Sequence, residues 1–268
     1  DTAVHSLDKN GEWKDIDNTL YESGSEYSTS NARIKFAKKI TGNESIFTLH
    51  ENNRKITLSL DGAIKKTTGV ATNTETEVDE TSTTLQKMMT LDKLSSRISY
   101  KDIFDGVDLE YIVVSNNVKE NIIVKEQKDA YSYSFTLELN NLSASLSATG
   151  DVEITDPDSG EVLYIIPAPV VYDANMTYAS ENDAYYTLET IGQKEYRLTV
   201  TASTAWMNAS DRTFPVTIDP AIYHGGYGMQ QMCDTYVAED DPTSAYGSET
   251  YLRVGYDDSN ANLISKVE

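Results

Sequence analysis

The stretch Lys55–Leu60 (KITLSL) alternates polar and apolar side chains and ends at the turn pair Asp61-Gly62. Side chains of a β-strand point alternately to its two faces, so this pattern predicts a strand with one buried face. Arg33–Lys38 (RIKFAK) alternates in the same way. Further runs suited to strands are Leu109–Val114, Asn121–Lys125, Tyr131–Leu139, Val162–Ile166, Tyr185–Glu189, Tyr196–Thr201 and Phe214–Ile218. The chain is therefore predicted to consist mainly of short strands.

Turn residues separate these runs at short intervals. The turn signals are Asn116-Asn117, Asn140-Asn141, Thr149-Gly150, Asp156–Gly160 and Ile191-Gly192. Short strands separated by turns at such short intervals are typical of β-sandwiches and open β-barrels. We predict an all-β fold of β-sandwich-like lobes with long loops and at most one short helix.

Two segments break this rhythm. Thr67–Thr84 is rich in threonine and has almost no large apolar residue, which predicts a long loop. After it, Leu85, Met88 and Met89 have helical spacing and predict one short helix that packs against the core.

The composition is strongly acidic. The 268 residues include 43 acidic and 22 basic side chains, for a formal charge of −21. Such a charge repels phosphate groups and anionic lipids, so we expect no nucleic-acid partner and no direct membrane binding. A cationic surface on a protein partner would instead be attracted.

Cysteine usage and hydropathy indicate an exported protein. Cys233 is the only cysteine, so no disulfide forms within the chain. A cysteine-poor β sequence rich in Thr, Ser, Asn, Asp and Tyr is typical of Gram-positive surface proteins. No apolar run approaches the ~18 residues that span a bilayer. We expect a secreted protein at the bacterial cell surface or in the cell wall.

The strand pattern changes after Phe214–Pro220 (FPVTIDP), where a strand ends at a proline. We predict a β-rich region over residues 1–220, which divides near residues 126–130 if it has two lobes. Residues 221–268 are predicted to be a linker and a partial β module.

An ordered series of motifs resembles a known family. The motifs are Trp13–Leu20 (WKDIDNTL), Tyr100–Tyr111 (YKDIFDGVDLEY), Val118–Ile122 (VKENI), Gly150–Ile154 (GDVEI), Ile165–Pro169 (IIPAP), Trp206 and Phe214–Pro220. Residues 10–220 thereby resemble the N-terminal region of Rhs/YD-repeat-type, wall-associated bacterial surface proteins. The resemblance implies a surface location and a role in contact or display, and it transfers no catalytic residue.

The tail resembles the opening of a DNRLRE domain, a β module found on such surface proteins. The matching residues are Asp234–Val237 (DTYV), Tyr246-Gly247 and Tyr251–Tyr256 (YLRVGY). Because that module is normally much longer, the chain is expected to end inside it.

The candidates for catalytic chemistry are few. His5, His50 and His224 lack metal-like spacing and a nucleophile elbow. Asp105, Asp108 and Glu110 could form paired glycosidase carboxylates, with Asp108 and Glu110 on one strand face, but a solvated face is favoured. Cys233 has no neighbouring base to activate a thiol or a thioester. We therefore expect the protein not to be an enzyme.

No cofactor is predicted. Asp156, Asp158 and Gly160, and separately Asp257, Asp258 and Asn260, are reminiscent of calcium loops but lack the full ligand spacing. A turn capped by Asp side chains explains the first group without metal, and calcium stays an open alternative. A Lys–Asn isopeptide cross-link is a further open alternative.

Tyrosine supplies the candidate binding residues. Among 18 tyrosines, Tyr131 and Tyr133 share one strand face, while Tyr236 and Tyr251 belong to the tyrosine-rich tail. Tyrosine is a good contact residue, although it also packs well between strands.

We therefore expect a non-catalytic binding or display module of a surface protein. The first hypothesis is a superantigen-like adhesin that recognises a host protein such as immunoglobulin through a Tyr-bearing face or an exposed strand edge. The alternatives are a carbohydrate-binding module that recognises a surface glycan, and a structural stalk or plug of an Rhs-type repeat shell.

Overall fold

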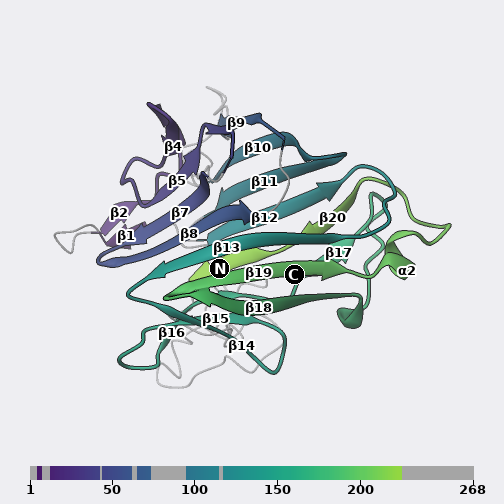
Figure 1. The fold of residues 1–268 in the computed structure, drawn as a ribbon. Helices are drawn as coiled ribbons and strands as arrows, with labels where there is room; N and C mark the ends of the chain where they lie inside the picture. The colour runs from purple at the N-terminus through teal and green to yellow at the C-terminus, as the bar shows by residue number, and fades with distance from the viewer. Residues whose placement is uncertain are drawn as a thin grey trace, which may run out of the picture. The chain divides into compact units, whose positions relative to one another are not determined.

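The computed structural model describes residues 5–7, 13–42, 44–61, 65–73, 95–114 and 117–224. These residues form antiparallel sheets arranged in layers (Figure 1). A small sheet pairs β1 (His5–Leu7) with β2 (Trp13–Asp15).

Two large sheets contain the other described strands. The eight-stranded sheet has the spatial order β18 (Ala184–Gly192), β19 (Glu195–Ala202), β13 (Ser132–Asn140), β8 (Arg54–Asp61), β7 (Ser45–Glu51), β5 (Ile34–Ala37), β4 (Glu26–Ser28) and β3 (Tyr21–Ser23). The eleven-stranded sheet has the order β14 (Ser143–Leu146), β15 (Val152–Thr155), β16 (Val162–Ile166), β21 (Ala221–His224), β12 (Asn117–Val124), β11 (Val107–Val114), β10 (Ser95–Phe104), β9 (Thr67–Asn73) and β6 (Lys39–Ile40), while β20 (Val216–Asp219) pairs with both β12 and β17 (Val170–Tyr172). The all-β prediction is confirmed.

The alternating pattern places one row of side chains from each strand in the core. In the eight-stranded sheet, Leu137 of β13 pairs with Leu58 on one side and Tyr196 on the other. Leu58 and Leu137 are buried, whereas Thr136 and Glu138 on the opposite face are at least partly accessible. The period of two in the sequence therefore becomes an inner apolar face and an outer polar face.

Aromatic side chains join the two sheets across the core. Tyr111 of β11 lies with its ring centroid 5.3 Å from that of Phe36 and 5.9 Å from that of Phe47, which belong to the other sheet. All three side chains are at most 1% exposed. Such ring pairs contribute about 0.5–1.5 kcal/mol beyond their buried area.

Helical structure is minimal in the described residues. The helix α2 (Thr204–Met207) has four residues, and its N-cap Ser203 accepts a hydrogen bond from the Trp206 N–H. A 3₁₀ turn, η1 (Glu181–Asp183), is the other helical element described. The helix expected at Leu85–Met89 lies outside the described residues.

The segment predicted as a loop begins with a strand. Thr67–Asn73 form β9, which pairs with β10, whereas residues 74–84 lie outside the described part. Sequence inspection missed β9 because its inward positions include Gly69 and Ala71 instead of large apolar residues. Gly69 is required there, because a Cβ would lie 2.8 Å from side-chain atoms of both Ile98 and Tyr100.

Strands from both halves of the described chain share the two sheets. β13, β18 and β19 extend the sheet that contains β3, β4, β5, β7 and β8, and β20 and β21 pair with β12. Residues 126–130 therefore do not separate two sheets or two lobes. Residues 221–224 form β21, which pairs with β12 and β16. The partial β module predicted after them lies outside the described residues, so it stays a prediction.

Within the described residues, no helix has the length and hydropathy that a membrane span requires.

The contact at Gly69 generates a stability prediction. We expect Gly69→Ala to lower the free energy of unfolding by about 1–3 kcal/mol, because the added methyl group overpacks the Tyr100 ring. Tyr100 has little room to move, since its hydroxyl donates to the Ala37 carbonyl at 2.6 Å. Chemical denaturation of the purified chain measures the effect. Gly42→Ala is the control, because a Cβ there meets nothing closer than 4.0 Å. Equal stability of the two variants would contradict the prediction.

Candidate functional site: a polar network on the outer face of the larger sheet

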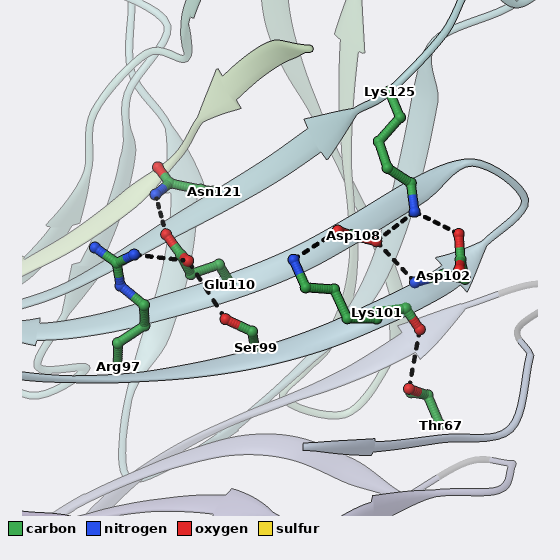
Figure 2. A network of polar contacts seen from close by, with 9 residues as sticks. All are labelled: Thr67, Arg97, Ser99, Lys101, Asp102, Asp108, Glu110, Asn121 and Lys125. Carbon is green, nitrogen blue, oxygen red and sulfur yellow. Dashed lines mark hydrogen bonds and ion pairs between the residues drawn. The ribbon is translucent and has the colours of Figure 1, made fainter. Parts of the chain in front are cut away.

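Polar side chains of β10, β11 and β12 meet on the outer face of the eleven-stranded sheet (Figure 2). At its centre, the Asp108 carboxylate accepts hydrogen bonds from Lys101 Nζ and Lys125 Nζ, each at 2.8 Å. The backbone N–H of Asp102 donates to the same carboxylate at 2.8 Å. Asp108 of β11 is thereby bonded to β10 and to Lys125, the residue that directly follows β12.

The local backbone explains how Asp102 reaches Asp108. The pairing of β10 with β11 shifts register between Tyr100 and Phe104, which is the mark of a bulge or similar irregularity. Within it, Asp102 has a φ of +50°, and its N–H is aimed at Asp108. The Asp102 carboxylate also lies 2.5 Å from Lys125 Nζ, so this lysine bridges two acids.

Asp108 is ionised despite its burial. The residue is only 4% exposed, and this desolvation opposes its charge. The Asp102 N–H and the two lysine ammonium groups outweigh that effect and hold the pKa of Asp108 below its ordinary value. A carboxylate stabilised in this way is a weak proton acceptor.

Glu110 is the second centre of the network. Its carboxylate accepts from Asn121 Nδ2 at 3.0 Å and from Ser99 Oγ at 3.4 Å, and Arg97 Nη1 lies 3.4 Å away. In Figure 2 the Asn121 side-chain oxygen points away from Glu110. Asp108 and Glu110 therefore share one strand face, as alternation predicted, with each carboxylate engaged by donors.

Asp105, the third acid of the paired-carboxylate hypothesis, lies apart at the β10–β11 turn. Its carboxylate is largely exposed and lies 2.6 Å from Lys65 Nζ. The hydrogen bond from Lys65 lowers the pKa of Asp105. The structure thus links all three acids to basic groups, and the chemistry this arrangement supports best is cross-strand attachment.

The tyrosines proposed for binding lie elsewhere. Tyr131 is 1% exposed, accepts the Lys128 N–H at 2.7 Å and donates to Asn208 Oδ1. Tyr133 is 6% exposed and packs on Phe104 with ring centroids 5.4 Å apart. Neither tyrosine contributes to an exposed recognition face, because both point into the core with the apolar row of β13. Tyr236 and Tyr251 lie outside the described residues.

The calcium-like loop is closed by its own hydrogen bonds. Asp156 Oδ1 accepts the N–H groups of Asp158 and Ser159, and Oδ2 lies 2.6 Å from Arg54 Nη2. The Arg54 guanidinium and these two N–H groups lower the pKa of Asp156 to about 2. No group of three or more His, Cys, Asp or Glu in the described part could hold a metal. Cys233 and Asp257–Asn260 lie outside it.

Sequence reasoning missed two buried acids. Asp173 is 1% exposed, accepts the N–H groups of Asn175, Thr177 and Thr213, and lies 3.5 Å from Arg212. Glu120 lies on the inner face of β12 and is 7% exposed. The signal for Glu120 was its position in phase with Val118 and Ile122, two apolar residues of the same strand.

The network generates a second stability prediction. We expect Asp108→Asn to lower the free energy of unfolding by about 1–3 kcal/mol, because charged hydrogen bonds are lost at a buried position. The folded-state pKa of Asp108 is depressed, so its contribution is present above the ordinary value of 3.8 and disappears as pH falls through the folded pKa. Denaturation of wild type and variant at several pH values tests this.

Asp105→Asn is the matched control, since it removes an exposed ion pair whose effect is screened by solvent. The network would not act as an attachment between strands if Asp108→Asn were no more destabilising than Asp105→Asn.

Comparison with known proteins supplies relatives but no family assignment. No family model matches the chain, and no solved structure matches it. The chain is similar to the tRNA3(Ser)-specific nuclease WapA of Bacillus spizizenii, with 28% identity over 250 residues and 90% of this chain. It is similar to the tRNA(Glu)-specific nuclease WapA of Bacillus subtilis subsp. natto, with 28% identity over 248 residues and 89% of this chain. The tRNA nuclease WapA of Bacillus subtilis is 26% identical over 247 residues, again 89% of this chain.

These relatives correct the functional expectations. Each of them is named a tRNA nuclease. Three predictions were therefore wrong: a non-catalytic module that binds a host protein such as immunoglobulin, the lack of enzymatic activity, and the lack of a nucleic-acid partner. The same names contradict the two alternatives, a carbohydrate-binding module and a structural stalk or plug. The error came from treating one chain's composition as that of a whole protein, since the chain spans only 10% of the length of each relative. The chain is thus similar to about a tenth of a tRNA nuclease.

Proposed function

We propose that this chain is a segment of a longer protein that cleaves tRNA. The observation that carries the proposal is the similarity to three tRNA nucleases along 89–90% of this chain. Because the match runs through nearly all of the chain, the fold described here is expected to recur in those nucleases. The substrate class follows from their names and not from a cleft or catalytic group in the described residues.

The electrostatics of the segment constrain how tRNA is bound. A formal charge of −21 opposes the approach of tRNA phosphates. The acids of the outer network are already engaged by Lys101, Lys125 and Arg97, so these cations are largely neutralised as phosphate contacts. We therefore expect tRNA binding by the longer protein to depend on further cationic residues or on divalent cations.

The first functional prediction is that the longer natural protein converts purified tRNA into discrete fragments. Gel analysis of tRNA after incubation measures the activity, with double-stranded DNA of similar length as the substrate control. Residues 1–268 are assayed in parallel at equal concentration. Cleavage by this chain alone would place the cleaving residues within it, and cleavage only by the longer protein would place them outside it. Intact tRNA with a folded longer protein would contradict the proposal.

We also propose that the longer protein is an exported, wall-associated protein of the Rhs/YD-repeat type whose sequence enters a DNRLRE-like module after residue 220. The motif series from Trp13–Leu20 to Phe214–Pro220 supports the first part, and Asp234–Val237 with Tyr251–Tyr256 supports the second. The single cysteine and the acidic composition fit an exported protein.

Cell fractionation tests this location. An antibody raised against residues 2–226 is expected to detect the protein in the wall and medium fractions and not in the cytoplasm. A cytoplasmic enzyme probed on the same blot controls for lysis. Detection in the cytoplasmic fraction alone would contradict a wall-associated location.

A further inference from the structure

Glu120 places a carboxyl group inside the core between the two sheets. It lies on β12 in phase with the buried Val118, Ile122 and Val124. Its Oε1 accepts a hydrogen bond from the Tyr111 hydroxyl at 2.8 Å, and that tyrosine is itself 1% exposed. A carboxyl group at this depth is rare unless a cation or several donors accompany it.

The described residues that line the cavity beside Glu120 include no cation that could neutralise it. The side chain lines a cavity of about 10 Å³, which has room for roughly one water molecule. The other lining residues come from both sheets and are Leu58, Phe135, Ile166, Tyr186, Leu198, Val200, Pro220 and Ile222. No Lys, Arg or His is among these described lining residues.

Titratable groups from three strands surround Glu120. Tyr111 faces it from β11, Tyr186 from β18 across the cavity, and Asp219 acts on it from β20. Lys119 is committed to Asp219, with Nζ 2.6 Å from Oδ2. The Tyr186 hydroxyl is buried and has no hydrogen-bond partner among the described residues, so a donor within this cavity would satisfy it.

Burial is the dominant effect on Glu120. It raises the pKa of this carboxyl to about 7, with the negative charge of Asp219 acting in the same direction and the Tyr111 hydrogen bond opposing it. The neutral acid is therefore the form that the fold prefers, and it carries an O–H donor that the carboxylate lacks.

Glu120 lies between the part of β12 that pairs with β20 and the part that pairs with β21. Residues 122–124 pair with β20, and residues 118–119 pair with β21. Between them, the Glu120 N–H donates to the Pro220 carbonyl at 2.9 Å. Pro220 has no N–H to return, so the ladder has one bond instead of two at this junction. The ladder between β12 and the β20–β21 segment therefore lacks one hydrogen bond beside the buried acid.

We propose that Glu120 is a buried proton-binding site that couples pH to the attachment of β20 and β21 on β12. With the proton bound, the junction is neutral and the sheets close over it. When the proton leaves, a carboxylate is confined in an apolar cavity, and opening of β20–β21 exposes it to water.

The direction of the pH effect follows from linkage. The folded-state pKa of Glu120 lies above its ordinary value of 4.5, so the folded chain binds more protons than the unfolded chain between these values. The contribution of Glu120 is therefore full at low pH and is lost as pH rises from about 4.5 through about 7. This trend is opposite to that of Asp108.

Hydrogen exchange of the full chain at pH 5.5 and pH 8 tests the proposal. After correction for the intrinsic exchange rate, protection of the β20 and β21 amides is expected to fall roughly 30-fold between these pH values, as a pKa moved from 4.5 to about 7 requires. Glu120→Gln keeps the size and polarity of the side chain but cannot ionise, so its protection should not change with pH. Amides of β7 and β8 show whether the opening is local.

Glu138→Gln is the matched control, because it makes the same chemical change at an exposed position of β13. It should retain the wild-type pH dependence. The proposal is overturned if wild-type protection is independent of pH, or if Glu120→Gln shows the wild-type dependence.

A direct titration covers the case in which Glu120→Gln does not fold. Side-chain carboxyl resonances of the ¹³C-labelled wild-type chain are followed across pH, and Glu120 is expected to titrate near pH 7. Titration of the Glu120 carboxyl near its ordinary value of 4.5 would overturn the proposal without any variant.

Discussion

Tyr111 connects the aromatic packing between the two sheets with the acid buried between them. Its ring packs between the sheets against Phe36 and Phe47, and its hydroxyl donates to Glu120. The same side chain therefore joins the two layers through apolar contact and anchors the acid buried between them. Because the Tyr111 ring packs against two buried aromatic side chains, the hydrogen-bond partner of Glu120 is positioned by core packing. Burial of a polar group at such a site is tolerated only with a bonded partner.

The inner and outer faces of the neighbouring strands β11 and β12 place two acids in opposite environments, Asp108 on β11 and Glu120 on β12. On the outer face, Asp108 is ionised because Lys101 and Lys125 bond to it. On the inner face, burial raises the pKa of Glu120, and none of the described residues that line its cavity is a cation that could offset this effect. One group therefore stabilises the fold more as pH rises and the other more as pH falls. Alternation along a strand is enough to produce this contrast, since neighbouring residues face different surroundings.

The sequence pattern predicted the fold more fully than the site. Alternation in Lys55–Leu60 correctly indicated strands, and it also placed Asp108 and Glu110 on one face. The burial of Tyr131 could have been inferred, because it alternates in phase with the apolar residues of β13. β9 could not be recognised, since its inward Gly69 is dictated by Tyr100 on a neighbouring strand. Partners such as Lys125 for Asp108 depend on strand register, which short-range periodicity does not determine.

The functional error has a different physical origin. A net charge of −21 is a sound reason for this segment to repel phosphate. It gives no information about the charge of the remaining nine-tenths of the length of the relatives. Electrostatic steering depends on the local field around a binding site, and that field falls off within about 10 Å at moderate salt. An acidic segment and a tRNA-cleaving site are therefore compatible within one long protein, provided that the two are separated by more than this distance.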